Sequence, residues 1–151
     1  MRRDIELPKD GGITSVDGQL VEVNLGSISP ERIVSELLLL QEGLVEALAI
    51  RYSGSQHRVR VTSATIEERA IAFWEDDLLR ITVPGSELGY WLQFFLKYYR
   101  DDMAEVDHID VEARNKRKNG SVIDIVLKVS RAKAPVNSDE ARRRLWMPPK
   151  C

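Results

Sequence analysis

The chain has 151 residues, of which 43% are hydrophobic and 30% are charged. This composition suits one globular domain and excludes a disordered chain. No apolar run approaches the roughly 20 residues that a membrane-spanning helix needs, so we expect no membrane contact. The single cysteine, Cys151, excludes a disulfide framework and a cysteine-based zinc site, which favours a cytoplasmic location.

Charge is divided unevenly along the chain. The formal net charge is −2 and the isoelectric point is about 5.8. Residues 1–113 contain 11 basic and 21 acidic residues, a net charge of −10, whereas residues 114–151 contain 11 basic and 3 acidic residues, a net charge of +8. Two interpretations follow, namely an acidic body with a basic arm, or two faces of opposite sign.

Residues 13–25 predict a β-hairpin. Asp17 and Gly18 can adopt the positive φ angles of a two-residue type I′ turn, and apolar residues flank them on both sides.

A long helix is predicted from Ser29 to about Ile50. Ser29 is a suitable N-cap, and Pro30 suits the first helical position. Two adjacent apolar stripes run along this helix, formed by Ile33, Leu37, Leu40, Leu44 and Leu48 and by Val34, Leu38 and Val45. Because this arc is wider than one sheet contact needs, the helix should pack on two internal elements, or on a sheet and a second copy of the chain.

The rest of the chain combines strand patterns with one aromatic helix. Apolar alternation predicts strands over residues 57–65, 66–74, 78–83, 105–113 and 121–130. Pro84, Gly85 and Ser86 open a helix that carries the stretch YWLQFFLKYY. On a helical wheel, its core face consists of Trp91, Leu92, Phe95, Leu96, Tyr98 and Tyr99, whereas Tyr90 and Phe94 fall on the polar flank.

These elements predict an α+β fold with a mostly antiparallel sheet and two long helices on one face. The order strand, helix, strand, strand occurs over residues 19–74 and again over residues 78–130. A doubled β-α-β-β unit is one interpretation of this order, and coincidence is the other. We expect a single domain over residues 1–133, followed by a basic tail over residues 134–151 that contains a short helix.

Motifs for catalysis are missing from the sequence. No serine stands in G-x-S-x-G, and neither G-x-G-x-x-G nor the P-loop pattern occurs. One alternative is a small enzyme that uses His108 and Asp110, which would share a strand face with Glu112, opposite Asp124. A solvated sheet face explains the same pattern, so we predict no catalytic residue, no metal site and no cofactor.

The preferred hypothesis is a non-enzymatic protein-binding protein that acts through an acidic surface. Such a surface attracts basic proteins and speeds their capture. Bacterial immunity proteins and adaptors bind their partners in this way. The likeness is one of physical character, because no motif is shared. The predicted partner-binding residues are Glu75, Asp76 and Asp77 at a hairpin corner, Tyr90 and Phe94 on the aromatic helix, and Trp146 in the tail. A homodimer through the first helix or the tail belongs to this hypothesis.

The alternative hypothesis is nucleic-acid binding. Basic residues cluster in the loop between the last two strands and in the tail, at Arg114, Lys116, Arg117, Lys118, Arg131, Lys133, Arg142, Arg143 and Arg144. A basic hairpin and a basic arm can follow phosphates, which supply most of the non-specific affinity for nucleic acid. The low isoelectric point of the whole chain argues against this hypothesis.

Overall fold

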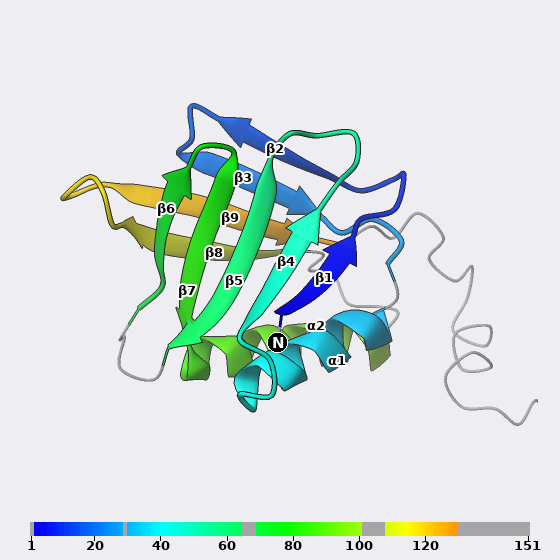
Figure 1. Ribbon diagram of the computed structural model, residues 1–151. Coiled ribbons are helices and arrows are strands. Elements are labelled where there is room, and N and C mark those ends of the chain that lie inside the picture. The colour runs from blue at the N-terminus through cyan, green and yellow to red at the C-terminus, as the bar shows by residue number, and fades with distance from the viewer. Residues whose placement is uncertain (1, 29, 65–68, 101–107, 130–151) are drawn as a thin grey trace, which may run out of the picture.

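The computed structural model describes residues 2–28, 30–64, 69–100 and 108–129, which form nine strands and two helices (Figure 1). The strands are β1 (Arg2–Glu6), β2 (Gly12–Val16), β3 (Leu20–Asn24), β4 (Ala47–Arg51), β5 (Arg58–Ala64), β6 (Ile71–Glu75), β7 (Leu78–Pro84), β8 (His108–Asn115) and β9 (Val122–Lys128). The helices are α1 (Pro30–Gln41) and α2 (Gly85–Arg100). The predicted α+β class is confirmed, whereas the predicted tail lies outside the described residues. Within that described part, neither helix has the length and apolar composition that crossing a membrane requires.

All nine described strands belong to one sheet, in the order β1-β4-β5-β7-β6-β8-β9-β3-β2. Parallel and antiparallel pairings alternate across it, with four of each kind. The sheet is therefore mixed rather than mostly antiparallel. Each antiparallel pair is a hairpin between consecutive strands, which local pattern reveals, whereas the parallel pairings join strands that are distant in sequence.

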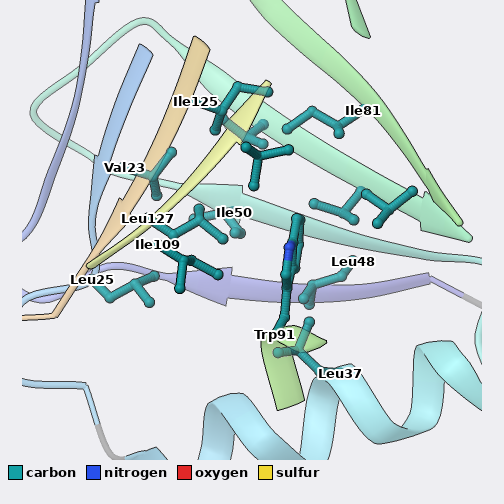
Figure 2. Close-up of a cluster of buried hydrophobic side chains, with 14 of the residues drawn as sticks. Val23, Leu25, Leu37, Leu48, Ile50, Ile81, Trp91, Ile109, Ile125 and Leu127 are labelled. Carbon is teal, nitrogen blue, oxygen red and sulfur yellow. The ribbon is translucent and has the colours of Figure 1, made fainter. Parts of the chain in front are cut away.

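The sheet folds over so that its inner surface encloses a single core. We call β1, β4, β5, β7 and β6 the front leaf, and β8, β9, β3 and β2 the back leaf (Figure 1). Inward side chains from both leaves belong to one buried cluster, for example Ile81 from the front leaf and Ile125 from the back leaf. Figure 2 shows Trp91 of α2 within this cluster, with Leu37 of α1 next to it. The two helices lie side by side beneath the leaves (Figure 1).

The first helix is shorter than predicted, because a glycine cap ends it. Gly43 has φ 74°, which glycine adopts without strain. Its N–H donates to the Leu40 carbonyl at 3.2 Å, and the N–H of Leu44 donates to the Leu39 carbonyl at 3.0 Å. This pair of bonds is the Schellman arrangement, and it stops α1 at Gln41.

Strand β4 occupies residues that the sequence pattern assigned to the helix. All of its residues except Arg51 are buried, and a continuously apolar strand cannot be distinguished from a buried helix by periodicity. The wide apolar arc of α1 has two internal packing partners, because α1 contacts α2 as well as β4 and β5. Leu38 on this helix nevertheless remains 47% exposed.

Several local predictions are confirmed at the expected positions. The β2–β3 hairpin turns at Asp17 and Gly18, which have φ angles of 53° and 70°. Strands β5, β7, β8 and β9 coincide closely with the predicted segments. Strand β6 begins at Ile71, later than predicted, and residues 65–68 lie outside the described part of the chain.

The strand–helix–strand–strand order does occur twice, with the predicted members in the second set and with β4 and β5 as the last two strands of the first set. The two sets are β3-α1-β4-β5 and β7-α2-β8-β9, and each is preceded by a strand, β2 or β6, that forms a hairpin with its first member. The last strand of each set pairs in parallel with the first strand of the other, as β5 with β7 and β9 with β3. The two halves of the chain are thus interlocked in one sheet.

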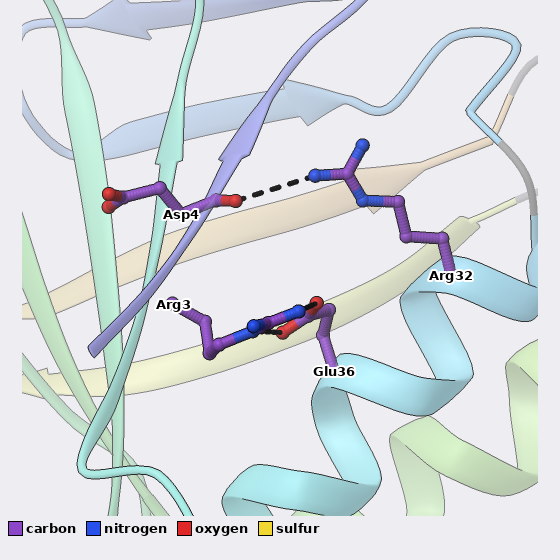
Figure 3. A network of polar contacts seen from close by, with 4 residues as sticks. All are labelled: Arg3, Asp4, Arg32 and Glu36. Carbon is purple, nitrogen blue, oxygen red and sulfur yellow. Dashed lines mark hydrogen bonds and ion pairs between the residues drawn. The ribbon is translucent and has the colours of Figure 1, made fainter. Parts of the chain in front are cut away.

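Strand β1 was not expected from the sequence, because Ile5 is the sole aliphatic side chain in its segment RRDIE. An ion pair attaches this strand to α1 (Figure 3). The Nε of Arg3 donates to Oε2 of Glu36 at 3.1 Å, and its Nη2 donates to Oε1 at 2.9 Å. Hydrogen bonding to this carboxylate, together with its charge, raises the pKa of Arg3. The carboxylate side chain is 4% exposed, whereas that of Arg3 is 46% exposed.

Candidate functional site

Basic side chains gather on the outer surface of the front leaf. In β5, Val59 and Val61 are buried in the core, so alternation turns Arg58 and Arg60 outward. Strand pairing adds residues of β7, of β6 and of the end of β8 to the same surface. We call this surface the basic face, and it consists of Arg58, Arg60, Phe73, Arg80, Arg114, Lys116 and Arg117.

One row of side chains crosses the basic face perpendicular to the strands. Arg60 of β5 is the register partner of Arg80 of β7, and Arg80 is the register partner of Phe73 of β6. Neighbouring strands lie about 4.8 Å apart, so these side chains are immediate neighbours. Together with Lys116 and Arg117 from the loop after β8, they form what we call the basic row.

The aromatic ring of Phe73 holds two cations at one end of this row. The Nζ of Lys116 lies 5.2 Å from the ring centroid, and the Cζ of Arg117 lies 4.8 Å from it. Cations over an aromatic face are attracted by its quadrupole, by about 0.5–1 kcal/mol each at exposed sites. Phe73 is half-buried and both cationic side chains are exposed. The ring therefore restrains the two charges while leaving them accessible.

Hydrogen bonds fix the loop that presents these cations. The N–H of Lys116 donates to the Ala72 carbonyl of β6 at 3.0 Å, and the N–H of Arg117 donates to Oδ1 of Asn115 at 3.0 Å. Gly120 closes the loop with φ 77°, as the Asn-Gly turn signal predicts. The loop is thus attached to β6 and its conformation is defined without a ligand.

The carboxylate of Glu75, two residues after Phe73 on β6, lies next to the basic face. Oε1 of Glu75 accepts from Nη2 of Arg80 at 3.0 Å and from its Nε at 3.3 Å. Both side chains are partly exposed, so this ion pair contributes little to stability. Its consequence for binding is larger, because Glu75 neutralises one cation in the middle of the basic row.

The outer surface of the back leaf has the opposite charge. Alternation in β8, β9 and β3 turns four carboxylates outward, those of Asp110, Glu112, Asp124 and Glu22. Glu112 and Asp124 are register partners, as the sequence predicted for this face. Within the described residues, these four carboxylates make the outer surface of the back leaf more acidic than the basic face.

The residues of the enzyme alternative lie on this acidic outer surface. Nε2 of His108 is 3.8 Å from Oδ2 of Asp110, and Arg69 pairs with Glu112 at 3.5 Å. Side chains of His108 and Asp110 are 45% and 74% exposed. Among residues 2–28, 30–64, 69–100 and 108–129, no group of three His, Cys, Asp or Glu side chains is arranged to hold a metal ion.

The predicted partner-binding residues fall at two separate places. Glu75, Asp76 and Asp77 form the β6–β7 hairpin corner, where Asp76 has φ 55°. Strand β7 leads from this corner to α2, and its seven residues span about 20 Å. The structure therefore does not bring the acidic corner together with the aromatic residues of α2. Trp146 lies outside the described residues.

The two aromatic residues of this set differ in burial. Tyr90 is 63% exposed, whereas Phe94 is half-buried against the core and contacts Phe95 edge-on at 5.0 Å between ring centroids. On the same helix, burial raises the pKa of Glu87, which lies one turn before Tyr90.

Of the basic residues that the sequence singled out, Arg114, Lys116 and Arg117 lie together on the basic face. Lys118 is exposed at the tip of the same loop, and the basic residues from Arg131 to Arg144 lie outside the described part. The sequence analysis did not include Arg58, Arg60, Arg80 or Phe73 among the candidates. The alternation in HRVRVTSAT placed two of them on an outer face, but nothing in the sequence paired β5 with β7 or β6 with β8.

Comparison with known proteins adds no further assignment. No protein-family model matches the chain, and no curated protein has a significantly similar sequence.

Proposed function

We propose that this protein is a non-enzymatic binding protein that takes nucleic acid on its basic face. The basic row supports this proposal, because it aligns Arg60 and Arg80 with Phe73, whose ring lies under Lys116 and Arg117. Clustered cations displace the counterions of a phosphate backbone, and the released counterions drive binding. The low overall isoelectric point reflects acidic residues elsewhere, including those on the back leaf.

Charge reversal on the basic face should strongly weaken nucleic-acid binding. The double variant Arg80→Glu/Arg117→Glu should lose at least about tenfold in affinity, and the slope of log K against log salt should fall by about 2. Fluorescence anisotropy with labelled oligonucleotides from 50 to 200 mM salt measures both quantities. The matched control is Arg32→Glu/Lys97→Glu, which changes the net charge equally on the exposed surfaces of α1 and α2.

A second variant should bind more tightly, a result that misfolding cannot produce. Glu75→Gln releases Arg80 from its carboxylate partner, so this variant should bind oligonucleotides several-fold more tightly than the native protein. The proposal is contradicted if the native protein binds no DNA or RNA at low salt, or if the control pair of substitutions weakens binding as much as the pair on the basic face.

A protein-binding role is the second candidate, favoured by apolar side chains that the fold leaves uncovered. Leu38 of α1, Leu44 just after it and Tyr90 of α2 are 47%, 68% and 63% exposed. If they bind a second copy of the chain, light scattering should give the mass of a dimer. Leu44→Glu should then convert the dimer to a monomer, whereas Glu42→Gln, at an exposed neighbour, should not. A native protein that is monomeric at high concentration rules out this homodimer.

A further inference from the structure

We infer that the basic face binds single-stranded rather than duplex nucleic acid, with bases stacking beside Phe73 and phosphates contacting the arginines of β5 and β7. This inference depends on the proposed function and names its ligand class. The observation behind it is the composition of the basic row, in which a planar aromatic ring and a planar guanidinium adjoin two further arginines.

Stacking surfaces are useful only to a ligand whose base faces are accessible. In a duplex the base faces are covered by neighbouring base pairs, and only the edges are open in the grooves. In a single strand each base can stack on an aromatic ring or on a guanidinium plane. The Arg117 guanidinium lies over the Phe73 ring, with its Cζ 4.8 Å from the ring centroid, so the two stacking groups are at one place on the basic face.

The remaining groups of the face suit a sugar–phosphate backbone. Arg60 and Arg80 are side by side on adjacent strands, and Arg58 follows on the same side of β5. One row further along, the hydroxyls of Thr62 and Thr82 are 3.3 Å apart on the same outer surface. Arginines can contact phosphate oxygens in pairs of hydrogen bonds, and hydroxyls can bond to phosphate or sugar.

The size of the basic row also fits a short single-stranded site. From β5 to the end of β8 it crosses three strand spacings, about 14 Å. The major groove of a duplex is about 12 Å wide and receives a protruding helix or strand pair. The loop that carries Arg117 is instead attached to β6 by the Lys116–Ala72 hydrogen bond and lies over Phe73. The cations of this loop therefore lie on the sheet surface and do not protrude from it as a groove-reading element would.

The test compares one sequence as a single strand and as a duplex. Fluorescence anisotropy with a labelled 20-mer, in a buffer of about physiological ionic strength, should show tighter binding of the single strand than of the duplex. Phe73→Leu should weaken single-strand binding about tenfold, whereas Phe73→Tyr, which retains a ring, should keep most of it. Arg117→Lys, which keeps the charge and loses the guanidinium plane, should weaken single-strand binding more than duplex binding.

The outcomes separate this inference from the proposed function. Binding of duplex as tightly as single strand, with Phe73→Leu equal to the native protein, overturns the inference and leaves the proposed function standing. Equal binding of polyglutamate overturns it as well, because the face would then recognise charge on an acidic polypeptide. Absence of binding to every oligonucleotide overturns the proposed function itself. Circular dichroism of each variant confirms that the fold is retained.

Discussion

Arg3→Met is expected to lower the urea midpoint of unfolding clearly, because it leaves the carboxylate of Glu36 buried without a counter-charge. That side chain is only 4% exposed, and its hydrogen bonds to Arg3 come from both Nε and Nη2. The loss should be smaller than for a fully buried ion pair, since Arg3 is half-exposed and water can approach the site. Urea unfolding, followed by circular dichroism, measures the loss.

The reciprocal substitution should cost much less. In Glu36→Leu the guanidinium of Arg3 remains, but it is 46% exposed and water can solvate it. The double variant Arg3→Met/Glu36→Leu should recover most of the stability lost in Arg3→Met, since well-packed apolar residues often replace buried ion pairs at little cost. If Arg3→Met and Glu36→Leu destabilise the protein equally, burial of the carboxylate is not the dominant effect.

Most of the elements follow from local pattern, and the errors have identifiable physical causes. Strands with one buried face, such as β5 and β8, alternate apolar and polar residues and are recognisable from sequence. Strand β4 is buried on both faces, so its residues show no alternation of apolar and polar side chains. Gly43, which caps α1, was the missed sign that the helix ends before this strand. Strand β1 is mostly charged because it lies at a sheet edge.

The candidate site was only partly predictable, for a different reason. Lys116 and Arg117 were recognisable because they adjoin each other in one loop. Phe73 and its hairpin partner Arg80 join them only through the parallel β6–β8 pairing, and Arg60 joins only through the parallel β5–β7 pairing. A parallel pairing requires a crossover, and its partners are not specified by any local turn. A surface assembled across such pairings therefore cannot be predicted from local sequence patterns.

Trp91→Ala is expected to cost about 3–5 kcal/mol, the usual range for removing a large aromatic side chain from a core. Trp91 is 2% exposed and belongs to the cluster that joins α2 to both leaves (Figure 2). Its loss opens a cavity where Leu37 of α1 meets the strands. Urea unfolding should show a lower midpoint with an unchanged m-value.

Two substitutions in the same helix separate core packing from helix propensity. Gln93→Ala, at an exposed position of α2, should change stability by less than about 0.5 kcal/mol. Tyr90→Ala removes a large aromatic group that is 63% exposed, so it should also cost little in the isolated chain. If Tyr90→Ala destabilised the protein as much as Trp91→Ala does, Tyr90 would have to be covered in solution. That result would favour a partner on α2, because the fold described here buries only the opposite side of this helix.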